Sequence, residues 1–514
     1  MIIPSRRRAL LAAIAGAALV GGAIAALHYH RLGLTLSHYD ARGHLVVARR
    51  VIDSITPGWQ QIGAVWLPLP HLLNLLPVQI DALYRNGASA VAVSVVAYAI
   101  ATAAIASIVL VLTGSALAAT AGAAVFALNP NVLYLQATPM TEPLLLALTI
   151  VAVAMLIENA QGRASSAPTP SDATSPGVVL ALACLTRYEA WPVTACAVAA
   201  AAWARLRAGD SWTAASRRVA PAAIYPAAAV LAFLVFSRIV VGQWFVSSGF
   251  FVPENKALGD PVLAAAEIWW GAHTLTGYLT IVLSSAGLIA LLVTGVMKRE
   301  RAAGIITLSL LAAATVPWAA FVKGHPFRIR YMVPLIAVEA IGAGIAIGAV
   351  KRLRVVAALL VLGALAYDSR VLSLFRPDAP MAPVIIEAQW EQPNAPVRQT
   401  ITRYLRANYD GTTIMASMGS LGHYMQEASR DGFAIRDFLH EGNGDIWLAA
   451  IEGPRPFVGW VLIEEKANGG DALARIAREN PRFLVGFSRV CEGAGLALYK
   501  RDAVAQNRTP IVSR

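Results

Sequence analysis

Residues 36–77 read LSHYDARGHLVVARRVIDSITPGWQQIGAVWLPLPHLLNLLP and lie between two long apolar runs. A segment in that position is expected to be a loop at a membrane surface. Asp40 and His44 stand four residues apart, which places them on one face if the segment is helical. An apolar stripe with offset charges is typical of a helix in the membrane interface, and here it consists of Leu45, Ala48 and Ile52 beside Arg49, Arg50 and Asp53. The loop, taken as residues 28–87, is the segment around which the other functional predictions are built.

Asp40 is the first candidate for chemistry in this loop. A carboxylate that a compact loop presents at the membrane surface can act as a general base. The alternative is that Asp40 caps a helix that begins at Ala41, because Asp is a favoured N-cap residue. The spacing alone leaves both interpretations open.

The composition determines the broad class of protein. Hydrophobic residues make up 57% of the chain and charged residues 14%, and the mean hydropathy is +0.58. These values exclude an ordinary soluble domain and predict a protein with many membrane spans. The net charge of +12 comes mainly from basic residues in short loops, where they set topology, and no aromatic and basic patch indicates nucleic-acid binding. The cysteines show neither a disulfide framework nor a zinc-site spacing; they are Cys184, Cys196 and Cys491.

The apolar runs predict about eleven spans, each near the roughly 20 residues that a bilayer requires. They lie near 9–27, 88–112, 116–135, 142–157, 219–240, 276–296, 302–322, 332–350 and 355–373, with two short spans inside 177–205. The basic residues Arg6, Arg7 and Arg8 precede the first run, which favours an uncleaved first span with a cytoplasmic N-terminus over a signal peptide. A flexible cytoplasmic linker is predicted at 158–177 and an outer loop at 241–275.

A change of composition near residue 375 predicts two domains, a membrane domain over 1–373 and an extracytoplasmic α/β domain over 374–514. Strands are predicted at 412–417, 457–463, 483–487 and 496–500, and helices near 396–408, 420–429, 443–452 and 470–480. No nucleophile elbow, Walker loop or dinucleotide fingerprint occurs in the second domain. Its candidate ligand-binding side chains are His423, His440 and Glu441, for which structural or surface roles are the commoner alternative.

Three further polar groups fall at predicted outer ends of spans, and each has a structural alternative. Glu142, followed by Pro143, suits the first turn of a helix. Arg187 and Glu189 can form a salt bridge with each other. The segment 325–331 (HPFRIRY) carries arginines outside, against the positive-inside rule, and arginines near helix ends often reach lipid headgroups. Together these groups predict carboxylates and arginines on one membrane face, able to hold an anionic lipid head and to deprotonate an acceptor.

The order of these parts resembles the GT-C class of integral-membrane glycosyltransferases, and within it the aminoarabinose-transferase and protein O-mannosyltransferase branch. The shared parts are Tyr39-Asp40 in a first outer loop, Asn129-Pro130, Thr141-Glu142-Pro143, the turn from Leu185 to Glu189, Arg330-Tyr331 with Pro334, and a C-terminal extracytoplasmic domain.

The resemblance implies a polyprenyl-phosphate sugar donor, transfer at the outer face of the cell (inner or plasma) membrane, and a lipid, glycan or protein acceptor. It implies that Asp40 is the base and that Arg330 binds the lipid phosphate. Further substrate contacts are predicted for His44, Glu142, Arg187, Glu189, His325, Arg328 and Tyr331. A doubled acidic motif found in some branches is absent after Asp40. The need for a divalent metal therefore stays open, and no other cofactor is implied.

Two other functions fit parts of the sequence. A transporter or flippase of lipid-linked sugars predicts ionisable residues near the bilayer centre and internal repeats, and neither is evident. A scaffold that uses its outer α/β domain for partners leaves the large loop with Asp40 unexplained. An enzyme is the preferred prediction.

Overall fold

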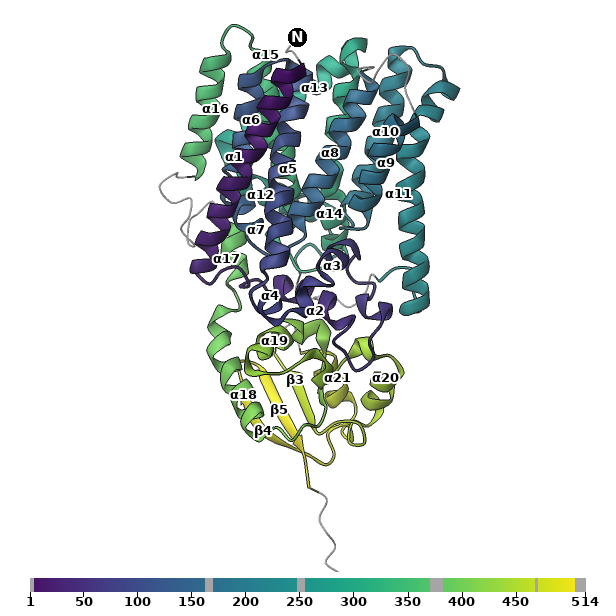
Figure 1. The fold of residues 1–514 in the computed structure, drawn as a ribbon, viewed down its shortest axis with the longest axis vertical. Coiled ribbons are helices and arrows are strands. Elements are labelled where there is room, and N and C mark those ends of the chain that lie inside the picture. The colour runs from purple at the N-terminus through teal and green to yellow at the C-terminus, as the bar shows by residue number, and fades with distance from the viewer. Residues whose placement is uncertain (1–3, 162–169, 247–254, 370–381, 467–469, 504–514) are drawn as a thin grey trace, which may run out of the picture.

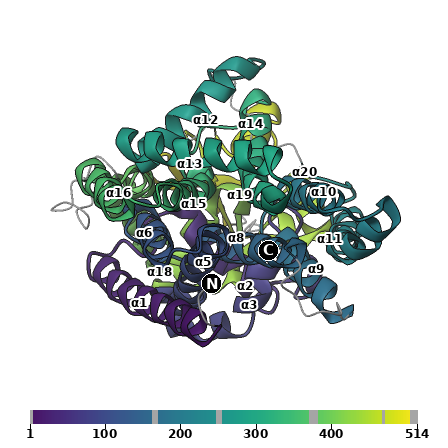
Figure 2. The same ribbon diagram turned by 90° about the horizontal axis from the view of Figure 1, so that it is seen from above.

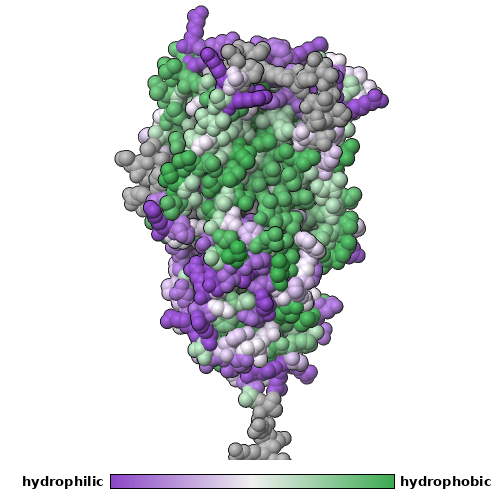
Figure 3. All heavy atoms as spheres, viewed as in Figure 1, coloured by the Kyte–Doolittle hydropathy of each residue, from purple (hydrophilic) through white to green (hydrophobic). Residues whose placement is uncertain are grey.

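A bundle of long helices carries a small sheet domain beyond one of its ends (Figure 1). The computed structural model describes residues 4–161, 170–246, 255–369, 382–466 and 470–503. Short helices of the first loop lie between the bundle and the sheet domain (Figure 1). Hydrophobic residues cover most of the visible side of the bundle, and hydrophilic residues gather at its far end and around the sheet domain (Figure 3). The chain is therefore a polytopic α-helical membrane protein, as predicted.

The bundle is seen from above in Figure 2. Its elements are α1 (Pro4–Arg31), α5 (Ala88–Thr113), α6 (Ala116–Ala127), α7 (Pro130–Leu135), α8 (Glu142–Ala160), α9 (Pro170–Cys184), α10 (Ala190–Ala208), α11 (Trp212–Val240), α12 (Pro261–Thr276), α13 (Tyr278–Met297), η3 (Arg299–Ala314), α14 (Thr315–Val322), η4 (Ile329–Met332), α15 (Val333–Ala349) and α16 (Arg354–Ser369). In the described ranges seven helical segments are long and apolar enough to cross a membrane: α1, α5, α8, α11, α13, η3 with α14, and η4 with α15. The predicted total of eleven stays a prediction.

Three predicted elements differ in the structure. The predicted outer loop at 241–275 contains a helix, α12, whose N-terminus is capped by the Asp260 carboxylate. The predicted span at 116–135 is broken into α6 and α7, because the Asn129 side chain caps a new helix with Pro130 in its first turn. The predicted span at 302–322 begins as a 3-10 helix and becomes α-helical only at Thr315. The predicted linker at 158–177 lies partly outside the described residues.

The first loop is folded into five short helices between the two domains. They are α2 (Tyr39–Arg50), η1 (Trp59–Ile62), α3 (Leu69–Asn74), η2 (Pro77–Gln79) and α4 (Asp81–Asn86). The apolar face of α2 is covered by protein: Leu45 and Ala48 belong to a buried cluster that includes Ile435 of the sheet domain. Ile52 lies beyond the end of α2 and is half exposed. The helix at the interface therefore packs on protein along the face that was expected to meet lipid.

The sheet domain contains a five-stranded sheet in the order β2-β1-β3-β5-β4. Its strands are β1 (Ile414–Ala416), β2 (Phe438–Leu439), β3 (Trp460–Glu464), β4 (Phe487–Gly493) and β5 (Leu496–Arg501). Strands β2, β1 and β3 are parallel, and β5 pairs antiparallel with both β3 and β4. The predicted strand at 483–487 is wrong except for its last residue, because β4 begins at Phe487 and Phe483 instead fills the core. The short strand β2 was not predicted.

The helical elements of this part of the chain are α17 (Pro383–Ala388), η6 (Gln392–Asn394), α18 (Ala395–Asn408), α19 (Met418–Ala428), η7 (Ser429–Asp431), η8 (Ile435–Asp437), η9 (Glu441–Asn443), α20 (Asp445–Glu452) and α21 (Ala472–Glu479). The predicted domain boundary at 373/374 lies outside the described residues. Val384, Ile385 and Ala388 of α17 belong to the main core of the bundle. Helix α17 therefore packs against the bundle, although it follows the predicted boundary.

Polar contacts hold the sheet domain on the first loop. The Arg436 Nε donates to the Asp53 carboxylate at 2.8 Å, and the Gln61 side chain donates to the Gly442 carbonyl at 2.8 Å. Asn443 donates to the hydroxyls of Ser54 and Thr56 at 3.1 and 3.0 Å. The first loop is thus fixed from both sides, which makes its side chains fit for precise positioning.

Candidate active site

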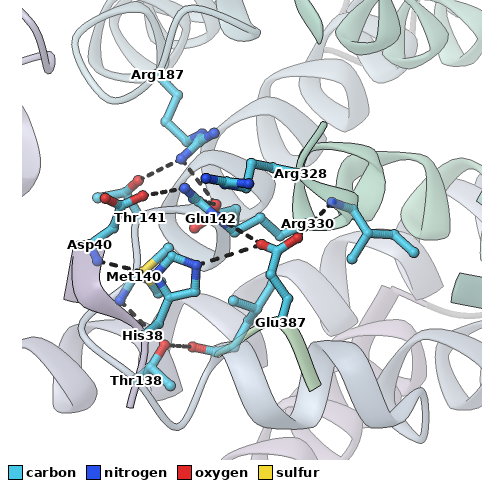
Figure 4. A network of polar contacts seen from close by, with 12 residues as sticks. His38, Asp40, Thr138, Met140, Thr141, Glu142, Arg187, Arg328, Arg330 and Glu387 are labelled. Atoms are coloured by element: carbon cyan, nitrogen blue, oxygen red, sulfur yellow. Dashed lines mark hydrogen bonds and ion pairs between the residues drawn. The ribbon is translucent and has the colours of Figure 1, made fainter. Parts of the chain in front are cut away.

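Arg330 lies at the centre of a cluster of ion pairs between the bundle and the first loop (Figure 4). Its guanidinium pairs with Asp40 of the first loop and donates to Glu142 at the start of α8 at 2.9 Å. A third carboxylate, that of Glu387 on α17, lies 3.4 Å from its Nε. Arg330 thus joins three segments of the chain. Asp40 lies 290 residues and Glu142 lies 188 residues from Arg330 in the sequence, and Glu387 follows Arg330 on α17.

Arg187 is the second cation of the cluster. It lies in the turn between α9 and α10 and donates to Glu142 at 3.1 Å, to Thr141 at 3.1 Å and to Glu189 at 2.6 Å. Burial alone would lower the pKa of Arg187, but the carboxylates of Glu142 and Glu189 outweigh burial and raise that pKa above its ordinary value. The expected salt bridge between Arg187 and Glu189 is present, and Glu142 connects this pair to Arg330.

The local fold of α2 leaves the Asp40 carboxylate available for the cluster. The helix begins at Tyr39, and its N-cap is His38, whose Nδ1 accepts from the Asp40 backbone N–H at 3.1 Å. The alternative in which Asp40 caps a helix starting at Ala41 is therefore wrong. The imidazole does the capping, and the aspartate side chain points to Arg330 (Figure 4).

Asp40 is also the most accessible carboxylate around Arg330. Its side chain is 14% exposed, whereas those of Glu142 and Glu387 are 1% and 2% exposed. Buried carboxylates that share an arginine serve mainly to hold it in place. A substrate entering this site would therefore meet Asp40 before either glutamate.

Glu387 and His38 complete the cluster and were not among the predicted site residues. The Glu387 carboxylate accepts from the Ile329 backbone N–H at 2.8 Å and lies 3.5 Å from the His38 Nε2. The available signal was a single carboxylate in the apolar segment PVIIEA, because a charge that is buried in such surroundings needs a partner. Its position after the change of composition near 375 assigned it to the second predicted domain, whereas its neighbours Val384 and Ile385 pack in the main core of the bundle.

Arg328 has a different environment from the other two arginines. Its Nε donates to the Tyr39 hydroxyl at 3.1 Å, and its guanidinium lies over the rings of Trp390 and Tyr39 at 5.5 and 6.0 Å. In the described part of the chain it has no carboxylate within ion-pair distance. Among the three arginines, Arg328 therefore has the N–H donors that pair least with protein carboxylates.

Tyr331 belongs to the edge of the cluster. Its ring faces the guanidinium groups of Arg330 and Arg187 at 4.9 and 5.9 Å, distances at which cation–π attraction operates. The ring of Tyr331 is thus close to both arginines.

His44 and His325 lie beside the cluster. His44 contacts the His71 ring nitrogen at 3.1 Å and packs on Trp66, and it touches a small cavity of about 20 Å³ next to Thr141, room for about one water molecule. The His325 Nδ1 lies 2.9 Å from the Pro326 carbonyl, and burial lowers the pKa of this imidazole. Ion pairs and cation–π contacts therefore connect six of the nine predicted residues, namely Asp40, Glu142, Arg187, Glu189, Arg330 and Tyr331, and the ring of His325 lies 5.6 Å from that of Tyr331.

The candidate residues of the sheet domain have separate positions. His440 is buried and caps η9 by accepting from the Gly442 N–H at 3.0 Å, and Glu441 accepts from the Met418 N–H at 2.7 Å. Both are structural contacts. His423 lines a cavity between the domains. Among the described residues no group of three or more His, Cys, Asp or Glu side chains is arranged to hold a metal ion, and the question of a metal stays open.

An apolar bundle, a first loop that carries a carboxylate into an arginine cluster, and a sheet domain beyond that loop define a GT-C-like fold. Among solved structures the chain is similar to the crystal structure of ArnT from Cupriavidus metallidurans bound to undecaprenyl phosphate, with a TM-score of 0.57 over 94% of this chain and 98% of that chain. This likeness confirms the predicted fold class. The identity is 12%, and at that level the likeness is one of fold.

No protein-family model matches the sequence, and no curated protein matches it in a sequence comparison.

Proposed function

We propose that this protein is a membrane glycosyltransferase that moves a sugar from a polyprenyl-phosphate donor to an acceptor hydroxyl. The support is of two kinds. The fold is like that of ArnT, whose crystal structure contains undecaprenyl phosphate. The single observation that carries the proposal is the contact between Asp40 and Arg330, which holds a proton acceptor in a cluster of arginines (Figure 4).

The reaction is a single displacement with inversion. The acceptor oxygen forms a bond to the anomeric carbon while the bond from that carbon to the phosphate oxygen breaks, and the electron pair stays on the lipid phosphate. The proton of the acceptor hydroxyl passes to the Asp40 carboxylate. General-base assistance of this kind contributes on the order of 10²–10⁴ in rate.

The arginines have different roles in this proposal. Arg330 pairs with Asp40, Glu142 and Glu387 and so positions the base. Arg328, held by Tyr39 and Trp390, is the best placed to stabilise charge on the departing phosphate, because its donors pair with no carboxylate among the residues that the structure describes. Glu142 and Glu189 hold Arg187, which can add a third positive charge on the phosphate or contact the sugar.

The topology follows from the same proposal. The end of the bundle that carries the first loop and the sheet domain faces the outside of the cell (inner or plasma) membrane, where lipid-linked sugars are used. The transporter alternative needs ionisable groups near the bilayer centre, whereas the cluster around Arg330 includes Asp40 of α2 and Glu387 of α17, helices that lie at the end of the bundle next to the sheet domain (Figure 1).

The experiment is transfer by the Asp40→Asn variant. Purified protein in lipid nanodiscs is given polyprenyl-phosphate pentoses and hexoses with a cell-envelope extract as acceptor, and release of polyprenyl phosphate is measured. We expect a loss of 10²–10⁴-fold with intact folding and donor binding, since the amide keeps the contact to Arg330 but accepts no proton.

The matched control for this experiment is Asp81→Asn. Asp81 is an exposed aspartate of the same loop that pairs with Arg49 and Arg85. Full transfer by a well-folded Asp40→Asn protein would refute the proposed base.

A further inference from the structure

A second cavity lies between the first loop, α18 and α19, beside the ion-pair cluster. Its volume is about 200 Å³, far above the about 10–15 Å³ that one water requires. Tyr39 and Arg42 line it from the first loop, Glu391 and Arg398 from the region of α18, and His423 and Glu427 from α19. Interfaces that serve only stability are packed to the density of protein interiors, so an open polar space of this size is unusual for a contact between two domains.

The charges that line this cavity are mostly neutralised within the protein. Arg42 donates to Glu427 at 2.8 Å, and Arg398 donates to Glu391 at 2.6 Å. Burial, together with the nearby guanidinium groups of Arg398 and Arg42, lowers the pKa of His423 to about 3, so this imidazole is neutral and offers one donor and one acceptor. Arg430 also lines the cavity; it is exposed and has no ion pair with a carboxylate of the described residues. The walls therefore present hydrogen-bond donors and acceptors side by side, with one exposed guanidinium left unpaired.

That pattern fits one class of ligand better than another. A bare phosphate or carboxylate requires donors with uncompensated positive charge. A saccharide carries many hydroxyls, each able to donate and to accept, and so matches walls that alternate carboxylate, guanidinium, amide and imidazole. The amides come from Gln392 and Gln399, which also line the cavity.

Tyr39 connects this cavity to the proposed catalytic centre. Its ring lies on the cavity wall, edge to face with His423 at 6.4 Å between ring centroids. Its hydroxyl accepts from Arg328 at 3.1 Å, and the next residue in the chain is Asp40. A ligand that fills the cavity and passes the Tyr39 ring would thus bring a hydroxyl toward the base.

From this geometry we propose that the cavity between the first loop and the sheet domain is the acceptor subsite and that the acceptor is a saccharide chain. The role of the cavity as an acceptor subsite rests on the proposed function. The binding of a saccharide in the cavity does not depend on that function and can be tested separately.

The test fills the cavity without touching its ion pairs. Ala395 lines the cavity at the start of α18, and Ala407 lies exposed on the same helix away from it. Ala395→Trp is the test variant and Ala407→Trp the matched control. Saturation-transfer NMR on the full chain in nanodiscs measures binding of a panel of neutral pentose and hexose trisaccharides, with inorganic phosphate as competitor.

We expect saccharide signals with the unchanged protein and with Ala407→Trp, a loss of at least tenfold in affinity with Ala395→Trp, and no competition by phosphate. Equal binding by Ala395→Trp, or no binding of any trisaccharide by the unchanged protein, would overturn the proposal. Displacement by millimolar phosphate would overturn it in favour of an anion site.

The same measurement on Asp40→Asn separates the two proposals. Saccharide binding that persists in Asp40→Asn, with transfer also unchanged in that variant, would remove the proposed base and leave the subsite standing.

Discussion

At the scale of single residues, the three arginines of the cluster differ in the number of protein carboxylates with which they pair. Arg330 is buried and shared among Asp40, Glu142 and Glu387. Removing one partner of a buried ion network leaves unpaired charge and typically costs about 3–5 kcal/mol. A neutral replacement of Arg330 would therefore confuse a loss of folding with a loss of donor binding. Arg328, which has no such carboxylate partners among the described residues, separates these effects.

We predict that Arg328→Gln weakens donor binding roughly 10- to 100-fold, because a hydrogen bond to a charged group is worth about 1.5–3 kcal/mol. The measurement is the affinity for polyprenyl phosphate in nanodiscs. Arg328→Lys keeps the positive charge and should retain part of the affinity. Unchanged affinity in Arg328→Gln, with an unaltered unfolding temperature, would exclude Arg328 from the phosphate site.

At the scale of elements, α13 and α15 approach each other through glycines. A Cβ atom at Gly287 would lie 1.9 Å from the Gly342 carbonyl oxygen, and one at Gly342 would lie 2.5 Å from the Ser284 carbonyl oxygen. In membranes, small residues at a helix contact allow the close packing that drives helix association. The position of α15, which begins at Val333, two residues after Tyr331, depends on this contact.

We predict that Gly287→Ala destabilises the protein by about 1–3 kcal/mol, since the new methyl group forces two backbones apart. Thermal unfolding in detergent measures the change. Gly363→Ala on α16 is the control, because a Cβ there meets nothing within 4 Å, and alanine is the better helix former. Equal unfolding temperatures for the two variants would argue against the close contact of α13 and α15.

The contact between α2 and α3 makes the stability of the first loop depend on pH. Burial, with the nearby Arg50 guanidinium, lowers the pKa of His71 to about 3, and burial, with His71, also lowers the pKa of His44. In the unfolded chain both groups take up protons near the ordinary pKa of 6.5. The unfolded state then binds more protons than the folded state between these values, so stability is complete above about pH 6.5 and falls as the pH falls toward 3.

We predict that the unfolding temperature declines from pH 7 to pH 5, because the free energy of unfolding falls by up to about 1.4 kcal/mol per pH unit for each histidine. His71→Gln should flatten this decline, because glutamine does not titrate. His30→Gln changes an exposed histidine at the end of α1 and should follow the unchanged protein. A decline that is identical in all three proteins would assign the acid sensitivity to other groups.

At the scale of the whole molecule, the proposed function requires that the sheet domain and the first loop face the outside. We predict that a cysteine at Ala407, in a chain without Cys184, Cys196 and Cys491, reacts with a membrane-impermeant maleimide in intact spheroplasts. A cysteine at Thr213, at the opposite end of the bundle at the start of α11, should react only after permeabilisation. The reverse pattern would place the site on the cytoplasmic face and contradict the proposed topology.

The helices of the membrane domain follow closely from the sequence. A long apolar run in a bilayer must satisfy its own backbone hydrogen bonds, so run length alone predicts a helix; α5 at Ala88–Thr113 was expected at 88–112, and α13 at Tyr278–Met297 at 276–296. The positions of helix breaks follow less directly from the local sequence. The Asn129-Pro130 motif divides one predicted span into α6 and α7. This division depends on the Asn129 side chain, which caps the start of α7.

The sequence by itself determined the class of protein and most of the charged residues at the site. Charges rarely lie in apolar runs without a reason, so Asp40, Glu142, Arg187 and Arg330 were visible as candidates. Only the tertiary structure decided the partners: it brought Glu387 from beyond the apparent domain boundary to Arg330, and turned His44 away toward His71. The physical reason is that an ion pair depends on distance in space, and residues as far apart as 40 and 330 meet only after the helices have packed.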